Sequence, residues 1–130
     1  MLALLVTGSR TFANVGQVFE VLDSIRPDRV IVGDARGVDR MVVAWCNRRG
    51  IPCSVFAADW DAHGRSAGHI RNSQMVDALL QLSFRGYAPT AAAFFAMPPN
   101  DASPGTAACI RTLRRRGIEP VIHSEDSFPD

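Results

Sequence analysis

Two early segments combine glycine, hydroxyl and arginine residues at spacings that could hold an anion. In TGSR (residues 7–10), glycine permits a tight turn, serine offers a hydroxyl, and arginine offers a planar fork for phosphate or carboxylate. In GDARGVD (residues 33–39), two glycines flank an arginine directly before a helical pattern, where free backbone N–H groups favour an anion. The candidate ligand-binding residues here are Gly8, Ser9, Arg10, Gly33, Arg36, Gly37 and Asp39.

Asp39 admits two interpretations. Its carboxylate could accept a hydrogen bond from a ribose hydroxyl. An acid in the first helical turn also balances the helix dipole, and a glycine at a strand-to-helix turn is common. A ligand-binding interpretation therefore stands beside a purely structural one. An ordinary NAD fingerprint is absent, because the pattern GxGxxG does not occur and no acid ends the second predicted strand.

Later segments add five candidates. Trp60 stands in a polar stretch, where it could stack on a base or cover the edge of the core. Arg71 and Asn72 fall in the first turns of a predicted helix and could point back toward a pocket, or Arg71 could simply be solvated. Gly105 and Thr106 follow a Ser-Pro pair, which is ordinary at a helix start and also makes an anion cradle.

A metal site is the weaker interpretation of the polar stretch. Asp59, Asp61 and His63 alternate along it, but no cysteine and no second well-placed histidine joins them. We therefore expect neither a metal nor another cofactor.

The elements that must position these residues alternate regularly. Continuous apolar runs predict five buried parallel strands, at residues 2–6, 29–32, 53–57, 91–97 and 120–122. Helical periodicity predicts helices at residues 15–25, 38–46 (ending before Gly50), 69–82 and 105–116. Residues 59–68 are expected to form a long loop. This alternation predicts a single α/β domain with a doubly wound, Rossmann-like parallel sheet of order 3-2-1-4-5.

In such a sheet, ligands bind beyond the carboxyl ends of the strands, where the strand order reverses. The loops after strands one to four should therefore hold the site. The domain is expected to span residues 1–123, followed by a frayed acidic tail at 124–130.

The amino-acid composition excludes some kinds of site and argues against others. All 14 basic residues among the 130 are arginine, so neither a Walker A phosphate loop nor a lysine Schiff base can form, although genome bias also explains the missing lysine. The net charge of +1 argues against a dedicated nucleic-acid binder. Three cysteines without metal spacing fit a reduced cytoplasm. The apolar run at residues 2–6 lacks a preceding basic region and is interpreted as a strand, not a signal peptide, and no run is long enough to span a membrane.

Taken together, these loops resemble the SLOG superfamily, and specifically its YspA-like, cpYpsA-related members. The matching segments, in order, are VTGSR at 6–10, GxARGxD at 33–39, ADWxxHG at 58–64, AGxxRNxxM at 67–75, and Gly105-Thr106. The resemblance implies a Rossmann-like domain that binds a nucleotide or nucleotide-derived ligand, and that forms a homodimer or higher homo-oligomer. Related domains include LONELY GUY phosphoribohydrolases, cyclic ADP-ribose sensors and the single-stranded-DNA-binding DNA-processing protein A.

Two departures from the family pattern bear on activity. The superfamily's phosphate loop is usually PGGxGT, whereas residues 98–106 keep only the final Gly-Thr. The LONELY GUY enzymes carry a glutamate pair after that threonine, whereas Ala107, Ala108 and Cys109 follow here. Arg71 and Met75 match those enzymes, but Asn72 replaces their lysine.

These observations favour a module that senses or sequesters a nucleotide-derived ligand, with an ADP-ribose-like molecule as one candidate. A phosphoribohydrolase-type glycosidase is the alternative, in which Asp39 and Arg71 would be catalytic. Single-stranded DNA binding by the arginine-rich last helix is a third hypothesis.

Overall fold

A computed structural model describes residues 1–97 and 103–126. Most of the segment expected to replace the superfamily's glycine loop, and the last four residues of the expected tail, lie outside these described residues.

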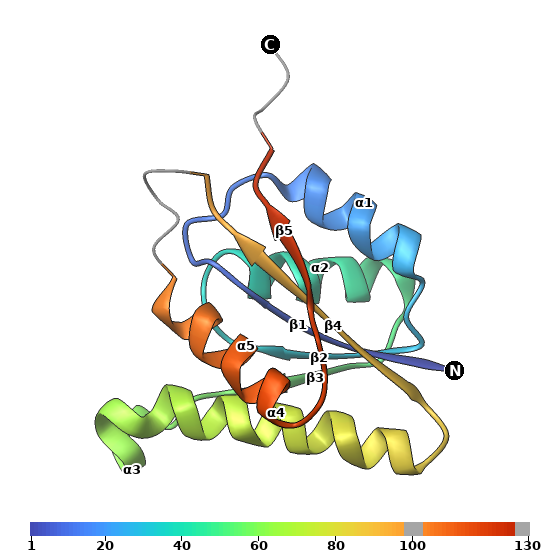
Figure 1. Ribbon diagram of the computed structural model, residues 1–130. Coiled ribbons are helices and arrows are strands. Elements are labelled where there is room, and N and C mark those ends of the chain that lie inside the picture. Colours follow the sequence, from blue (N-terminus) through green and yellow to red (C-terminus); the bar gives the residue numbers. More distant parts are fainter. Residues whose placement is uncertain (98–102, 127–130) are drawn as a thin grey trace.

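The strands form one parallel sheet in the order β3-β2-β1-β4-β5, which confirms the predicted order 3-2-1-4-5 (Figure 1). Apolar side chains cover both faces of the central strands, as expected for a parallel sheet between helices. Val6 in the middle strand, for example, stands opposite Val32 on one side and Ala92 on the other, and all three are fully buried. The strands are β1 (Leu2–Gly8), β2 (Arg29–Gly33), β3 (Cys53–Phe56), β4 (Ala88–Phe95) and β5 (Val121–Ser124).

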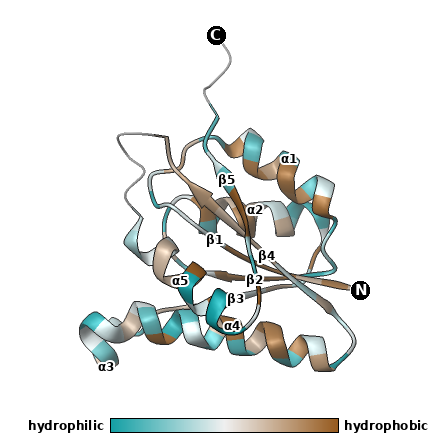
Figure 2. Ribbon diagram, viewed as in Figure 1, coloured by the Kyte–Doolittle hydropathy of each residue, from teal (hydrophilic) through white to brown (hydrophobic). Residues whose placement is uncertain are grey.

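Helices cover both faces of this sheet. On one face, α1 (Val15–Ile25) and α2 (Val38–Arg49) bury a core that includes Trp45, whereas α4 (Ala67–Phe84) and α5 (Pro104–Arg115) cover the other face (Figure 1). Figure 2 shows hydrophobic colour along the central strands and mixed colour along the helices, as expected for amphipathic helices. None of the described helices is long and apolar enough to cross a membrane.

The prediction of a long loop at residues 59–68 is wrong. The segment forms a short helix, α3 (Trp60–His63), and a 3-10 turn, η1 (Gly64–Ser66), and α4 begins two residues earlier than expected. Asp59 explains the error, because its side chain accepts a hydrogen bond from the Ala62 N–H at 3.1 Å and caps α3. A polar residue typical of loops acts here as a helix cap.

Two residues of the expected acidic tail, Ser124 and Glu125, are part of the fold. Ser124 ends β5, and Glu125 is anchored because its carboxylate accepts three backbone N–H groups, from Ala13 at 2.6 Å, Asn14 at 2.8 Å and Met97 at 2.9 Å. Glu125 therefore joins the turn before α1 to the end of β4 and belongs to the folded domain.

Candidate functional site

The turns after β1 and β2 are in direct contact, and two glycines make this possible. The Ser9 carbonyl oxygen accepts the Val38 N–H at 3.3 Å. Gly37, just before α2, has φ +75°, and a Cβ there would lie 2.6 Å from the Arg10 carbonyl oxygen. A Cβ at Gly8 would lie 2.5 Å from the Val38 side chain. The small residues of both predicted segments thus bring the two turns together.

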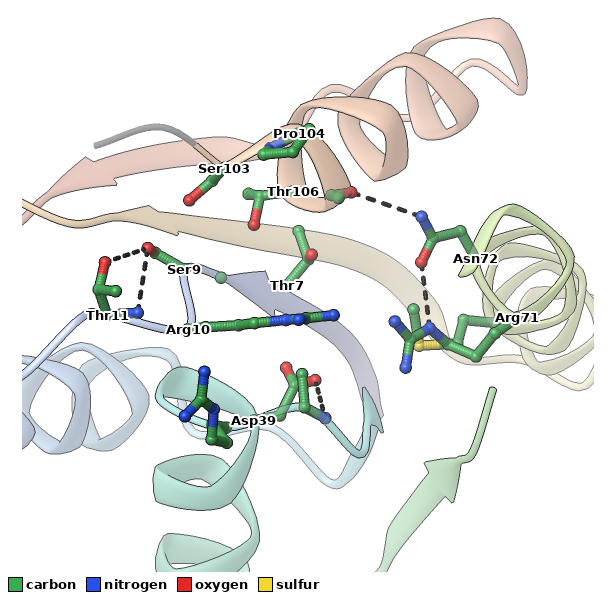
Figure 3. A pocket seen from close by; sticks show the side chains of 15 residues that line it. Thr7, Ser9, Arg10, Thr11, Asp39, Arg71, Asn72, Ser103, Pro104 and Thr106 are labelled. Carbon is green, nitrogen blue, oxygen red and sulfur yellow. Dashed lines mark hydrogen bonds between the residues drawn. The ribbon is translucent and has the colours of Figure 1, made fainter. Parts of the chain in front are cut away.

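A pocket of about 350 Å³ opens beside these turns, at the carboxyl end of β1 and next to the starts of α4 and α5 (Figure 3). This is the edge where the strand order reverses and where ligands bind in such sheets. Nine predicted residues line it: Gly8, Ser9, Arg10, Arg36, Asp39, Arg71, Asn72, Gly105 and Thr106. Six lining residues are absent from the prediction: Thr7, Thr11, Ala35, Met75, Ser103 and Pro104. These six residues are near predicted residues in the sequence, and this nearness could have been used to predict them.

Three predicted residues lie outside this lining. Gly37 makes the close contact of the two turns, and Trp60 faces an adjoining chamber. Gly33 leaves room for two pocket side chains, because a Cβ there would lie 2.6 Å from Arg71 Nη1 and 2.8 Å from Asp39 Oδ2. Gly33 therefore lets these side chains approach the end of β2, which is a different role from the expected ligand contact.

Asp39 is a buried carboxylate in the first turn of α2. It is 5% exposed, and its Oδ2 accepts the Ala35 N–H at 3.0 Å. Burial raises the pKa of Asp39 to about 6, and the hydrogen bond from Ala35 and the positive charge of Arg71 oppose that rise. An acid that served only to balance the helix dipole would be solvated, with its charged form favoured. The burial of Asp39 beside a pocket is instead typical of a functional residue.

A chain of hydrogen bonds crosses the pocket wall from the turn after β2 to α5. Arg71 Nη1 donates to Asp34 Oδ1 at 3.1 Å and to the Phe56 carbonyl oxygen at 3.4 Å, and its Nε donates to Asn72 Oδ1 at 3.2 Å. Asn72 Nδ2 in turn donates to the Gly105 carbonyl oxygen at 3.4 Å. Sequence reasoning missed Asp34, which matches part of the Arg71 charge within the protein. Arg71 and Asn72 thus position the start of α5 against α4.

Arg10 and Arg36 are the exposed cations of the pocket. Neither takes part in an ion pair within the described part of the chain. Figure 3 shows Arg10 extending across the pocket between Thr7 and Asp39. An exposed guanidinium offers a planar fork to an anion, so Arg10 and Arg36 are the side chains that an anion entering this pocket would meet.

The start of α5 adds uncharged donors. Thr106 is 4% exposed, and no hydrogen bond of its hydroxyl occurs among the described residues. Ser103 precedes the helix without capping it, and its buried Oγ has no hydrogen-bond partner in the described chain. The first backbone N–H groups of a helix are also without intrahelical partners. Hydrogen-bond donors are thus gathered at the start of α5 on the pocket wall.

Metal-binding side chains, Cys109 and the arginines of α5 were the other candidates for chemistry. Across residues 1–97 and 103–126, no three histidine, cysteine or acidic side chains gather closely enough to hold a metal. Burial raises the pKa of Cys109 to about 11, so its thiol stays protonated at neutral pH. On α5, Arg114 pairs with Glu119 at 2.8 Å and Arg116 pairs with Asp77 at 2.7 Å. Carboxylates thus match part of the charge on which the DNA-binding hypothesis depends.

The parallel strand order, with helices on both faces of the sheet, defines a Rossmann-like α/β domain. A family model described as the YspA, cpYpsA-related SLOG family matches residues 3–63, which run from β1 to the end of α3. The chain belongs to this family. It is also similar to the Gene 61 protein of Mycobacterium phage D29, with 32% identity over 136 aligned residues that cover 97% of this chain and 98% of that protein. Membership of the family points to a nucleotide-related function.

Proposed function

We propose that this protein binds a nucleotide or nucleotide-derived ligand, which it senses or sequesters, in the pocket at the carboxyl end of β1. The observation that carries the proposal is the convergence of hydrogen-bond donors and cations on one cavity. The Thr106 and Ser103 hydroxyls and the start of α5 lie on one side, and Arg10 and Arg36, which form no ion pair among the described residues, line the same cavity. Family membership supports a nucleotide as the source of the anion.

Each group has a defined role in this proposal. The Thr106 hydroxyl and the backbone N–H groups at the start of α5 bind a phosphoryl group, and Arg10 balances its charge. Asp39 accepts a hydrogen bond from a ribose hydroxyl, which its position on the pocket wall allows. Asn72 positions the phosphate-binding turn through its bond to the Gly105 carbonyl oxygen.

A thermal-shift panel of nucleotides and ADP-ribose derivatives tests the proposal. We expect at least one member to raise the melting temperature, because a ligand that binds only the folded state stabilises it. Thr106→Val removes the hydroxyl and keeps the shape, and should weaken that ligand about tenfold, the value of one hydrogen bond to a charged group. Thr112→Val makes the same change on the same helix, where the hydroxyl donates to the Ala108 carbonyl oxygen, and should leave affinity unchanged. A panel without a stabilising member would refute the proposal.

One observation favours a second function, an N-glycosidic hydrolase. Asp39, with its pKa raised to about 6, is suited to exchange a proton near neutral pH, as a general acid or base must. In this alternative, Asp39 and Arg71 are the catalytic pair. Release of free base from a nucleoside monophosphate, abolished by Asp39→Asn, would establish it. If a ligand binds and is recovered intact, the hydrolase alternative is refuted for that ligand and only the binding function is supported.

A further inference from the structure

The last described residues of the chain, 124–126, are bonded to the start of α1 and are named here the C-terminal strap (Figure 1). Gln17, in the first turn of α1, donates from Nε2 to the Ser124 carbonyl oxygen at 2.8 Å, and its Oε1 accepts the Asp126 N–H at 2.8 Å. Asn14, which caps α1, donates from Nδ2 to the Asp126 carbonyl oxygen at 3.2 Å. The backbone of the strap is thus held by side chains at the start of α1.

Glu125, in the middle of the strap, holds two other segments with one carboxylate. Its Oε2 accepts the N–H groups of Ala13 at 2.6 Å and Asn14 at 2.8 Å, whereas its Oε1 accepts the Met97 N–H at 2.9 Å. Its own N–H donates to the Phe95 carbonyl oxygen at 2.8 Å. Burial would raise the pKa of Glu125, but the three backbone donors together lower it below its ordinary value. The group is therefore charged at neutral pH, and hydrogen bonds to a charged acceptor are the stronger kind.

The turn after β1, residues 9–14, is attached to the end of β4 on both sides as a result. At its first residue, the Ser9 N–H donates to the Phe94 carbonyl oxygen at 2.9 Å. At its last two residues, the strap carboxylate joins the turn to the segment after β4. Arg10 and Thr11 lie between these attachments and line the main pocket, the one at the carboxyl end of β1. Figure 3 shows Arg10 extending across this pocket.

We propose that Glu125 is a positioning residue for nucleotide binding. Through the N–H groups of Ala13 and Asn14, it holds the turn after β1 in the conformation that directs Arg10 into the main pocket. The inference rests on the proposed function, in which Arg10 balances the charge of a phosphoryl group, and it assigns control of that site's affinity to the C-terminal strap. When the carboxylate is lost, the turn gains other conformations, and affinity falls with the fraction of molecules in which Arg10 is in place.

Isothermal titration with ADP tests the inference, at a temperature at which every variant is folded. Glu125→Gln keeps the shape of the side chain, but its amide NH₂ group meets an N–H donor at one of the two attached segments. We expect this variant to bind ADP about fivefold more weakly, the equivalent of one net hydrogen bond. Asp28→Asn is the matched control. It makes the same acid-to-amide change at a carboxylate that accepts the Leu2 N–H at 2.6 Å, at the opposite edge of the sheet, and should leave affinity unchanged.

A double-mutant cycle separates positioning from a purely structural role. If Glu125 acts through Arg10, Glu125→Gln should change ADP affinity less than twofold in an Arg10→Gln background. In a Thr106→Val background, which alters the start of α5 instead, the fivefold loss should persist. Hydrogen exchange without ligand should be faster over residues 9–14 in Glu125→Gln, and should be unchanged there in Asp28→Asn.

The outcomes separate the two proposals. If Glu125→Gln binds ADP as tightly as the wild type, or if its loss persists in full in the Arg10→Gln background, the positioning inference is overturned while nucleotide binding stands. Unchanged hydrogen exchange over residues 9–14, or an equal loss of affinity in Asp28→Asn, also overturns it. If the wild type does not bind ADP, the most stabilising nucleotide of the thermal-shift panel takes its place. If no nucleotide binds, the proposed function fails, and the inference with it.

Discussion

Replacing Asp39 by asparagine should stabilise the protein at neutral pH. The carboxylate is 5% exposed, and its burial outweighs the favourable contacts with Ala35 and Arg71. The asparagine side chain would be neutral, of nearly the same shape, and still able to accept the Ala35 N–H. Because the ionised aspartate is disfavoured in the folded state, removal of its charge should favour folding.

The size and the pH range of the effect follow from the pKa of Asp39. A rise from 3.8 to about 6 corresponds to about 3 kcal/mol of destabilisation of the ionised folded state. Below about pH 3 the carboxyl is protonated in both states, so its burial costs no folding stability. Between the two pKa values the unfolded chain ionises first, and folding stability falls as pH rises. Because the buried amide of asparagine also needs partners, we expect Asp39→Asn to gain about 2 kcal/mol near pH 7.5.

Urea denaturation of the wild type and Asp39→Asn between about pH 3 and pH 8 measures this difference directly. The gain should be largest above the pKa of Asp39 and should disappear near about pH 3. The control is Asp61→Asn, which removes an exposed carboxylate and should leave stability nearly unchanged at every pH. If Asp39→Asn is no more stable than the wild type near pH 7.5, or if its gain does not shrink on acidification, the burial argument is refuted.

Three further predictions concern residues that support the site or the turns around it. Gly37→Ala should lower the free energy of unfolding by about 2 kcal/mol in urea, because φ is +75° and the new Cβ would lie 2.6 Å from the Arg10 carbonyl oxygen. Glu125→Gln should cost about 1 kcal/mol in thermal unfolding at neutral pH. Its three backbone donors outweigh partial burial and lower the pKa of Glu125, so this difference should vanish as pH falls through that pKa. Asp34→Asn should free Arg71 and strengthen binding of a phosphorylated ligand about threefold in titrations at low salt, and a weakened ligand would contradict this role.

The fold could be predicted because the burial of a parallel sheet produces recognisable hydrophobic patterns in the sequence. Strands covered on both faces appear as continuous apolar runs, and helices that cover them appear as periodic ones. The prediction for the segment around Asp59 was wrong because polar residues that are typical of loops are also the residues that cap short helices. The homodimer implied by the family resemblance stays a prediction, which light scattering on the purified protein would test.

The predicted topology brings most of the candidate residues to one edge of the sheet, but it does not predict the contacts among them. Residues on turns at the same edge of a sheet must lie close together, so most predicted residues line one cavity. The partner of Arg71 could not be predicted, because Asp34 is 37 residues away in the sequence. Only the register of β2 against β3, which sets Gly33 opposite Phe56, brings that carboxylate within reach of α4.

The carboxylates of the described pocket bear on how the hydrolase alternative would work. Glycosidic hydrolysis generally uses two of them, one to protonate the leaving group and one to activate water or attack the sugar. Among the described residues, Asp39 is the only carboxylate that lines the main pocket. The nearest second candidate, Asp34, lies in the adjoining chamber that Trp60 faces and already accepts a hydrogen bond from Arg71. A single buried carboxylate can accept a hydrogen bond from a ribose hydroxyl without a second acid, so the proposed binding function does not depend on a further carboxylate.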